Sequence, residues 1–450
     1  MKTLAAIAIA SATLAAPALA LANTSPATAP AASPGLSEYQ FLLLGLSAAL
    51  VFFMQAGFAL LESGLSRAKN SVNVLMKNYL DMCFGAMIFW AVGYGLMFGA
   101  NSSGWFGTSE FLFNPQRPAD AMYFLYQVMF AATTATIVSG AIAERTHFSA
   151  YIVGSMIITG LIYPVFGAWA WSGWHGGQGW LAGIGFIDFA GSTVVHAIGG
   201  WCALAALLIV KPRMGRYGRD GSVRPIPGHN MSSATLGAFI LWLGWFGFNG
   251  GSVALASNGD GALLGKVLVN THMGGAGGAL GAVLAAMIFR SKILLTVCLN
   301  GAVGGLVSVT AGCHLMSPGF ALLTGVIAGF LVSVTEALLV TRKIDDVVGA
   351  VSVHLVGGIW GTLAVALFNP AAPFDIAQLK IQLIGVAAAG LWAFPTALLM
   401  YWLLDRTLGM RATALQEQRG LDFSEHAEIG YPEFQRDVVH SGKSSGADAP

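Results

Sequence analysis

Long, uninterrupted apolar stretches restrict what this sequence can fold into. Eleven of them lie between residues 38 and 405. About twenty apolar residues in a helix span the roughly 30 Å hydrocarbon core of a bilayer, and a backbone in lipid must satisfy its own hydrogen bonds. We therefore predict an all-α membrane protein with eleven transmembrane helices, at roughly 38–62, 72–99, 119–142, 148–170, 188–210, 233–256, 265–289, 293–312, 318–340, 347–369 and 379–405.

The composition agrees with this prediction. Hydrophobic residues make up 56% of the chain and charged residues 10%, against about 25% charged in soluble proteins. The 58 glycines suit close packing of membrane helices. The net charge of +1 gives no reason to expect a nucleic-acid partner. The four cysteines show neither CxxC nor zinc-site spacing, so they are interpreted as packing residues, and no metal or cofactor is predicted.

The N-terminus has the pattern of a secretory signal. Lys2 precedes an apolar run from Leu4 to about Ala16, and A-x-A sequences end at Ala20 and Ala22. Residues 1–22 are therefore predicted to be a signal peptide; an uncleaved first helix is the alternative. The Ser-, Pro- and Ala-rich residues 23–36 are predicted to form an extracytoplasmic tail, followed by the eleven-helix domain over 37–406.

The distribution of Lys and Arg predicts the orientation. With residues 23–36 outside, the inner loops hold twelve basic residues: Arg67, Lys69, Arg145, Lys211, Arg213, Arg216, Arg219, Arg224, Arg290, Lys292, Arg342 and Lys343. The outer loops hold three, namely Arg117, Lys266 and Lys380. Basic residues accumulate on the cytoplasmic side of membrane proteins. Residues 407–450 are thus predicted to be a cytoplasmic C-terminal tail.

An internal repeat connects the fifth and tenth predicted helices. Asp188 aligns with Asp346, and the histidines eight residues later, His196 and His354, align as well; a Gly-Gly pair follows each. Five helices per repeat is an odd number, so the two halves are inverted. Eight residues of helix extend about 12 Å. Both histidines are therefore predicted to reach the bilayer midplane from opposite sides, an arrangement typical of transporters.

The chemistry of these residues allows more than one interpretation. The two aspartates are expected to cap their helices, with proton transfer as the alternative. Two symmetry-related histidines in an apolar setting indicate function more strongly than packing, because an imidazole can accept and pass a proton. Metal binding is disfavoured because no carboxylate or thiolate lies at a comparable depth. His272 is interpreted as a packing residue. Bis-histidine haem ligation is a rival, but no span carries two histidines.

Aromatic residues near the outer ends of three helices predict a cation site. They are found in Trp169–Trp171, in Gly244–Ser252 and in Tyr126–Phe130. Trp and Tyr often occur at the membrane interface without further function. A desolvated cation over aromatic faces nevertheless gains about 2 kcal/mol without a fixed negative charge. Such a vestibule above two neutral histidines would suit a small cation that can lose a proton.

Four stretches carry a resemblance to a known family. They are Asp188–Gly200 (DFAGSTVVHAIGG), Gly244–Ser252 (GWFGFNGGS), Ala143–Ala150 (AERTHFSA) and Asp345–Gly361 (DDVVGAVSVHLVGGIWG). Over residues 37–431 the chain resembles the Amt/Mep/Rh ammonium transporter family, and the bacterial Amt branch in particular. The resemblance implies eleven helices in two inverted five-helix repeats plus a final helix. It further implies a homotrimer with one pore per subunit in a bacterial inner membrane, and no cofactor or enzymatic activity.

The resemblance also implies roles for individual residues. Phe130, Trp171 and Ser252 would form an external ammonium site supported by Asp188. Phe130 and Phe248 would form a phenyl gate. The histidine pair of the repeat, His196 and His354, would line the pore. Ammonium, or its analogue methylammonium, would lose a proton near the gate and cross as ammonia, with the proton carried separately.

The C-terminal sequence from Gly420 to Tyr431 (GLDFSEHAEIGY) is similar to the family's regulatory tail motif. The resemblance assigns regulatory roles to Gly420, Leu421, Asp422, His426, Glu428 and Tyr431, with a PII-class regulatory protein as a possible cytoplasmic partner. A solvated acidic tail without a partner is the alternative.

The chain departs from many relatives at three positions. Ala168 replaces a His before the Trp-x-Trp sequence, Tyr126 replaces a Phe, and Ala427 replaces a Gly. Ala168 makes the detail of the vestibule uncertain from sequence, and Ala427 should stiffen its turn.

Two other functions remain open. The chain could be an ammonium sensor that signals through its tail. It could also be a neutral gas channel of the Rh type, although a neutral gas needs no cation site.

Overall fold

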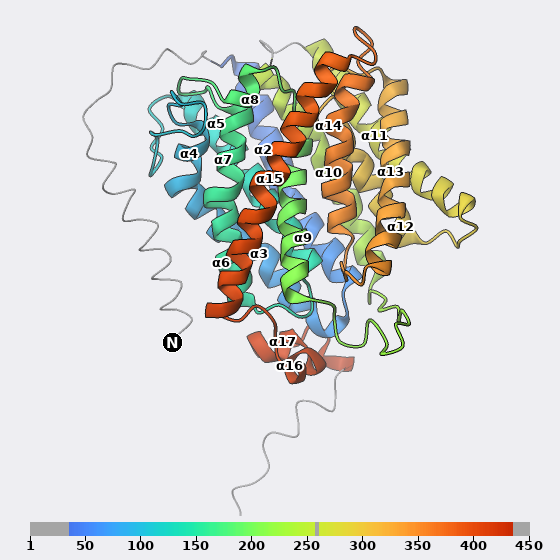
Figure 1. The fold of residues 1–450 in the computed structure, drawn as a ribbon. Helices are drawn as coiled ribbons and strands as arrows, with labels where there is room; N and C mark the ends of the chain where they lie inside the picture. Colours follow the sequence, from blue (N-terminus) through green and yellow to red (C-terminus); the bar gives the residue numbers. More distant parts are fainter. Residues whose placement is uncertain (1–35, 257–260, 435–450) are drawn as a thin grey trace, which may run out of the picture.

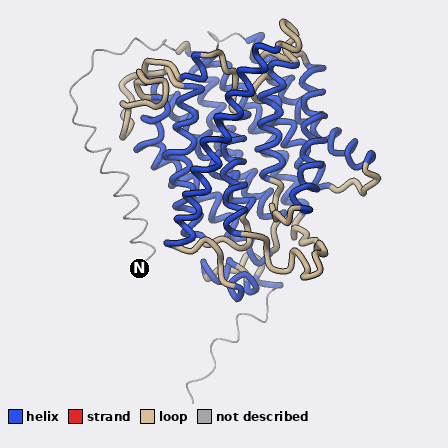
Figure 2. The backbone as a smooth tube through the Cα atoms, viewed as in Figure 1, coloured by secondary structure: helices blue, strands red, loops and turns tan. Residues whose placement is uncertain are grey.

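The computed structural model describes residues 36–256 and 261–434. The predicted signal peptide at 1–22, nearly all of the predicted tail at 23–36 and the last residues, 435–450, lie outside the described residues. Within the described ranges the chain is a bundle of roughly parallel helices, as Figures 1 and 2 show. Short helices α16 (Ala414–Arg419) and α17 (Leu421–His426) pack at one end, which we call the tail face. Helix α8 (Trp180–Gly183) lies at the opposite end, which we call the vestibule face.

The eleven predicted spans are confirmed as helical segments. Nine segments of the described chain are long and apolar enough to cross a membrane: Glu38–Leu65, Ala68–Phe98, Pro118–Ala141, Phe148–Trp171, Ser192–Val210, Met231–Ala256, Gly261–Ile288, Pro318–Thr341 and Ile376–Thr407. Two shorter apolar helices, Leu295–Val309 and Val351–Leu367, complete the set.

In the labels of Figure 1 these segments contain α2 (Glu38–Leu65), α3 (Ser71–Ile88), α4 (Tyr94–Phe98), α5 (Pro118–Ala141), α6 (Phe148–Ile157), α7 (Tyr163–Trp171), α9 (Ile198–Val210), α10 (Met231–Ala256), α11 (Gly261–Ile288), α12 (Leu295–Val309), α13 (Pro318–Thr341), α14 (Gly357–Leu367) and α15 (Ile376–Thr407).

Helix starts follow the expected local chemistry. Ser37 forms a capping box with Gln40 at the start of α2, and proline occupies the first turn of α5 and α13. Asp375 accepts hydrogen bonds from Ala377 and Gln378 at the start of α15. These caps satisfy backbone N–H groups that have no partner within the helix.

The two histidines lie in π-helical turns, which the sequence did not predict. Residues Ser192–Ala197 and Val351–Val356 are π-helical before α9 and α14 begin. A turn therefore separates Asp188 from the π-helical segment, and this turn contains Gly191 at φ 111°. In the second repeat, Gly349 at φ 82° occupies the equivalent turn after Asp346. The expectation of eight continuous helical residues between each aspartate and its histidine was wrong. π-Helical turns are frequent at functional sites because they re-aim side chains.

The Gly-Gly pairs of the repeat allow the two histidine segments to pack together. A Cβ atom on Gly200 would lie 2.5 Å from the backbone nitrogen of Leu355. A Cβ atom on Gly358 would lie 2.3 Å from the carbonyl oxygen of Ser192. Each repeat therefore presents a glycine to the histidine segment of the other. Only glycine fits this close backbone approach, so these glycines set how closely the two histidine segments pack.

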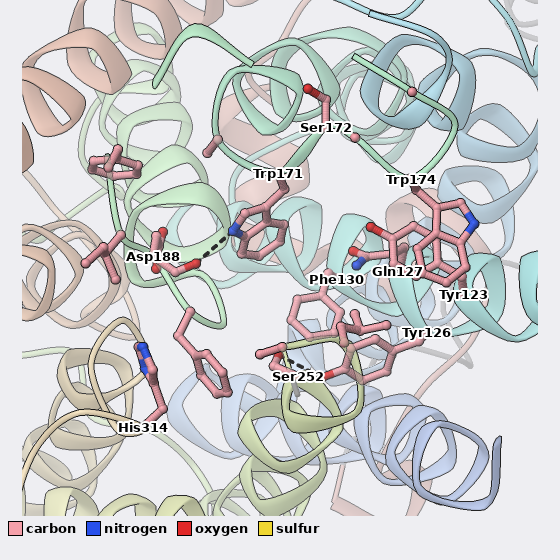
Figure 3. A pocket seen from close by; sticks show the side chains of 18 residues that line it. Tyr123, Tyr126, Gln127, Phe130, Trp171, Ser172, Trp174, Asp188, Ser252 and His314 are labelled. Carbon is pink, nitrogen blue, oxygen red and sulfur yellow. Dashed lines mark hydrogen bonds between the residues drawn. The ribbon is translucent and has the colours of Figure 1, made fainter. Parts of the chain in front are cut away.

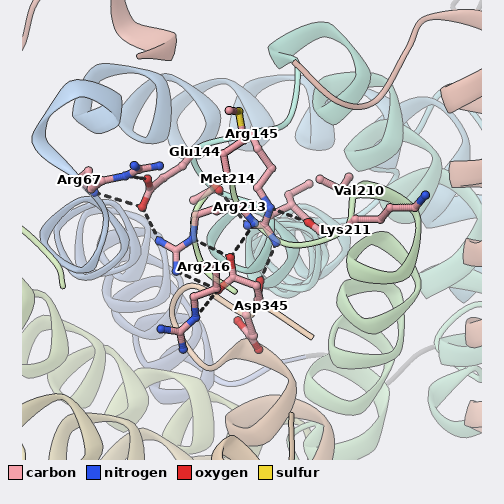
Figure 4. A network of polar contacts seen from close by, with 12 residues as sticks. Arg67, Glu144, Arg145, Val210, Lys211, Arg213, Met214, Arg216 and Asp345 are labelled. Atoms are coloured by element: carbon pink, nitrogen blue, oxygen red, sulfur yellow. Dashed lines mark hydrogen bonds and ion pairs between the residues drawn. The ribbon is translucent and has the colours of Figure 1, made fainter. Parts of the chain in front are cut away.

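A buried ionic network joins the loops of the tail face (Figure 4). Arg213 pairs with Glu144 at 2.6 Å and with Asp345 at 2.8 Å, and Glu144 also pairs with Arg67. Arg145 donates to the carbonyl oxygen of Asp345 at 2.6 Å. Burial alone would raise the pKa of Asp345, but hydrogen bonds and charge from Arg213 lower it to about 2. The network holds loops from both halves of the chain in one arrangement.

Candidate functional site

A cavity of about 610 Å³ opens between the helices near the vestibule face. Figure 3 shows that aromatic side chains line it, with a few polar groups between them. Trp171 comes from the end of α7, Phe130 from α5 and Ser252 from α10. The three residues that sequence predicted to form the external site therefore share one cavity, together with Asp188.

Asp188 shapes the cavity through hydrogen bonds rather than by pointing a free carboxylate into it. Its carboxylate accepts from the backbone N–H groups of Gly191, Thr193 and Val194, at 3.0, 2.8 and 2.8 Å. Its carbonyl oxygen accepts from the indole nitrogen of Trp171 at 2.7 Å. The expected capping role is thus present in the structure. Asp188 therefore holds the start of the π-helical turn through its carboxylate and contacts Trp171 through its backbone carbonyl oxygen.

Tyr126 forms the floor of the cavity beside Ser252. Its hydroxyl donates to the carbonyl oxygen of Phe248 at 2.6 Å and lies 3.3 Å from the hydroxyl of Ser252. Tyr126, where some relatives have Phe, therefore connects α5 to α10 and orients Ser252. A phenylalanine has no hydroxyl group and could not make these hydrogen bonds.

A continuous column of rings leads from the cavity to the histidines. Phe130 packs edge-on against Trp171 with centroids 6.1 Å apart and lies over Phe248 at 4.1 Å. The next ring is His196, 5.3 Å from Phe248, and then His354 at 5.2 Å from His196. All of these residues except Trp171 are buried. The predicted gate residues and the predicted pore residues are therefore consecutive members of one stack.

The histidine pair is held by close contacts. The Nδ1 atoms of His196 and His354 lie 3.2 Å apart, and the Trp245 ring stacks on His196 at 5.0 Å. One Nδ1 must donate and the other accept, because a neutral imidazole carries one N–H. The Nε2 atom of His196 is buried without a partner among the described residues. The pair thus has an unused polar atom within a buried stack of rings.

Three further cavity residues were not singled out from the sequence. Trp174 stacks on Tyr123 at 4.0 Å, Gln127 lines the wall, and the His314 ring stacks on Phe189 at 4.2 Å. Burial, with the nearby charge of Lys266, lowers the pKa of His314 to about 4, so its imidazole is neutral at physiological pH. No local pattern marks His314, because the chain brings it to the cavity only through the loop between α12 and α13.

His272 lies outside the ring column. It is exposed on α11, and its ring contacts Trp242 at 5.4 Å and Phe246 at 6.4 Å.

The C-terminal segment is docked on the tail face rather than surrounded by solvent. The Leu421 N–H donates to the Asn70 side chain at 2.9 Å, and Leu421 itself is buried. The Asp422 carboxylate accepts from the backbone N–H of Asn73 at 2.8 Å, and His426 lies 3.0 Å from the Asn73 amide. These contacts connect the tail motif directly to the start of α3.

Other residues of the motif complete the docking. Gly420 has φ 102°, and a Cβ atom there would lie 2.4 Å from the carbonyl oxygen of Lys69. The Tyr431 hydroxyl lies 2.8 Å from the Nε2 atom of His229. Glu428 is exposed. The predicted tail residues other than Glu428 thus contact the rest of the protein, and the Glu428 side chain is open to solvent.

Glu425, which sequence analysis did not select, makes two polar contacts with the bundle. It lies 2.5 Å from His147 and accepts from the N–H of Phe148 at 3.0 Å, at the start of α6. Burial would raise the pKa of Glu425, but the hydrogen bonds from His147 and Phe148 and the nearby positive charge together lower it.

Comparisons with known proteins agree with this architecture. Residues 42–431 match the model of the Ammonium Transporter Family. The chain is 42% identical over 412 residues to ammonium transporter Amt2 of Archaeoglobus fulgidus, covering 86% of each. It is also 42% identical over 404 residues to a putative ammonium transporter of Synechocystis, covering 87% of this chain and 74% of the relative.

Solved structures show the same fold. A protein described as a sensor Amt protein matches with a TM-score of 0.82 and 39% identity, covering 86% of this chain and 98% of that one. Mep2 of Candida albicans matches with a TM-score of 0.78 and 27% identity, covering 91% and 93%. The chain that forms this bundle, with its aromatic cavity and paired histidines, therefore belongs to the Ammonium Transporter Family. It is a multi-pass membrane protein and not an enzyme.

Proposed function

We propose that this chain recruits ammonium at the aromatic cavity, removes one proton there and conducts ammonia along the histidine pair, with the proton carried separately. The cation would rest against Trp171 and Phe130 and donate a hydrogen bond to Ser252. Aromatic faces and a hydroxyl attract a small cation without a countercharge. The Phe130–Phe248 pair would then admit the smaller, neutral molecule.

The column of rings carries this proposal. An apolar route from Trp171 to His354 favours a neutral species over a hydrated cation, because moving a charge through such a route is costly. The unpartnered Nε2 atom of His196 offers a lone pair or an N–H to a passing ammonia molecule. The paired Nδ1 atoms, 3.2 Å apart, offer a path along which a proton can pass between the rings.

The orientation and the partners extend the proposal. With the vestibule face outside, the tail face and its basic loops would lie in the cytoplasm, as the positive-inside rule predicts. The chain would form a homotrimer in a bacterial inner membrane and belong to the bacterial Amt branch. The docked tail would be the contact region for a PII-class regulatory protein.

The test uses purified protein in vesicles, with ammonium-evoked current and methylammonium uptake measured in parallel. His196→Asp and His354→Ala are expected to change or abolish both. Asn270→Asp is the control for His196→Asp, because it introduces a carboxyl group at a buried position outside the ring column. Column variants that assemble, reach the membrane and transport like the wild type would overturn the proposed pore.

An ammonium sensor is the second candidate, favoured by one observation. The sensor Amt protein matches this chain over 98% of its own length at 39% identity. The docked tail would then report occupancy of the cavity to a partner. Wild-type protein that binds ammonium but passes neither current nor methylammonium would favour sensing. Ammonia flux with no current would instead favour a neutral gas channel, which the cation-binding cavity argues against.

A further inference from the structure

Glu62 is a buried carboxyl group near the tail-face end of α2, and the proposed function does not use it. It is 2% exposed. Its Oε2 atom accepts hydrogen bonds from the Asn78 side chain on α3 at 2.8 Å and from the Ser139 hydroxyl on α5. Lys77, one residue before Asn78, is also buried, and its ammonium group donates to the carbonyl oxygen of Thr146 at 3.1 Å. Ionisable residues inside a membrane domain are costly and therefore indicate function.

A small cavity joins Glu62 to the histidine pair. It has a volume of about 20 Å³ and is lined by the side chains of Glu62, Asn300 and His354 together with apolar residues that include Phe58 and Val348. A single water needs roughly 10–15 Å³ and two to four polar partners. The cavity meets both conditions, and ammonia has nearly the size of water. His354 therefore faces the aromatic column on one side and a carboxyl-lined cavity on the other.

The cavity lies on the tail-face side of the pair. Val348 follows Asp345, which belongs to the ionic network of the tail face. The Phe58 ring contacts His354 at 6.2 Å and continues the column in that direction. Glu62 therefore lines a cavity that borders His354 on the side toward the loops of the tail face.

We propose, on the basis of the proposed function, that Glu62 receives the translocated proton through one water molecule in this cavity and returns it to ammonia that leaves the pore. In the first step the N–H bond of protonated His354 breaks, a proton passes across the water, and the Glu62 carboxylate becomes a carboxylic acid. In the second step the acid O–H bond breaks and the nitrogen lone pair of ammonia takes the proton. Ammonium forms, and Glu62 is again a carboxylate ready for the next cycle.

Two neighbouring acids are less well placed for this role. Glu336 accepts from the Asn300 amide at 2.6 Å and so lies behind the cavity wall. Asp81 is bonded to the Tyr151 hydroxyl, and to Thr136 at 3.1 Å, and does not line the cavity. Asp81 is as buried as Glu62 and so provides a matched control.

The test compares Glu62→Gln with Asp81→Asn in vesicles containing the full-length protein. Glu62→Gln keeps the side-chain size and an oxygen for Asn78 and Ser139. Ammonium-evoked current should fall by roughly a hundredfold in Glu62→Gln, the lower end of what a positioned acid–base group contributes. Influx of neutral ammonia, followed by internal pH, should persist. Asp81→Asn should keep its current.

The outcomes separate this inference from the proposed function. Wild-type current in Glu62→Gln, or an equal loss in Asp81→Asn, overturns the role of Glu62 and leaves the pore intact. A wild-type protein without current overturns the proposed function itself. Should Glu62→Gln fail to assemble, wild-type protein can be treated with an apolar carbodiimide, which reacts with protonated carboxylic acids. Labelling of Glu62 with loss of current supports the inference, whereas undiminished current after labelling, or no labelling during turnover, overturns it.

Discussion

The indole nitrogen of Trp171 donates a 2.7 Å hydrogen bond to the backbone carbonyl oxygen of Asp188. This bond ties the cavity wall to the turn that starts the first histidine segment. The aromatic wall of the cavity and the entrance to the ring column are therefore positioned by one contact. A change at either residue should affect the cavity and the column together, but in different ways.

Replacement of Trp171 should weaken the attraction of a cation. Trp171→Leu removes the aromatic face, which contributes about 0.5–2 kcal/mol, so the half-saturating ammonium concentration should rise roughly twofold to thirtyfold. Trp171→Phe keeps a face and loses the hydrogen bond to Asp188, and should show a smaller increase. Ammonium titrations of the evoked current measure both. Unchanged half-saturation in Trp171→Leu would show that the cation does not rest on this ring.

Replacement of Asp188 should act through stability. Asp188→Ala leaves three backbone N–H groups without their acceptor, and we expect a loss of about 2 kcal/mol or more in the free energy of unfolding. Asp188→Asn retains one acceptor oxygen and should lose less. Thermal denaturation in detergent measures the change.

Asp346→Ala is the matched control for that prediction. The Asp346 carboxylate accepts from Gly349 at 3.0 Å and from Val351 at 2.8 Å, which is the same cap in the other repeat. Both alanine variants should be destabilised to a similar extent. If Asp188→Ala melts like the wild type and only its current changes, Asp188 acts on the cation and not through the cap.

The ionic network of the tail face should make stability depend on pH. The folded-state pKa of Asp345 is about 2, below its ordinary value of 3.8. Its contribution is therefore complete above that ordinary pKa and is lost as the pH falls through about 2. Asp345→Asn should lose about 3 kcal/mol at neutral pH, because the buried Arg213 loses one of its two partner charges and keeps only Glu144.

The gap between wild type and Asp345→Asn should narrow as the pH falls below about 4. Melting temperatures at several pH values check this. Asp220→Asn, in an exposed loop, should match the wild type throughout. A gap that stays constant down to the lowest pH would mean that the side chain acts by shape and not by charge.

The tail should be stabilised by a glycine at position 427. Ala427 ends α17 with φ 55°, a left-handed conformation that costs a residue with a Cβ atom about 1 kcal/mol. Ala427→Gly should dock the tail more tightly and slow its limited proteolysis. Ser424→Gly, inside the same helix, should have the opposite effect. Faster cleavage of Ala427→Gly than of the wild type would contradict the docked arrangement.

Much of the fold follows from local patterns in the chain. The apolar runs predict the helical spans because hydrophobic length and internal hydrogen bonding are both local properties. The starts of α5 and α13 agree with their sequence prolines. The π-helical turns at His196 and His354 could not be foreseen, because a π turn and an α turn place similar demands on residue type.

The sequence predicted which residues belong to the candidate site but not how they contact one another. The sequence indicates Trp171, Phe130 and the two histidines by residue type, by repeat and by family resemblance. It does not indicate that Tyr126 orients Ser252 or that His314 lines the cavity, because these contacts join segments more than a hundred residues apart or depend on the path of a loop. Glu62 was missed for the same reason: its cavity exists only where α2 meets the tenth helical segment.

By itself, then, the sequence determined a membrane bundle of eleven helices, an inverted repeat with one histidine in each half, and capping aspartates. These depend on hydrophobicity, chain direction and hydrogen bonds between neighbours in sequence. Only the tertiary structure decided that the rings form one column, that the two Nδ1 atoms lie 3.2 Å apart, and that a carboxyl group faces His354 across a cavity of about 20 Å³. Those features depend on how closely separate helices approach, which glycine contacts such as Gly200 on Leu355 set and no single segment encodes.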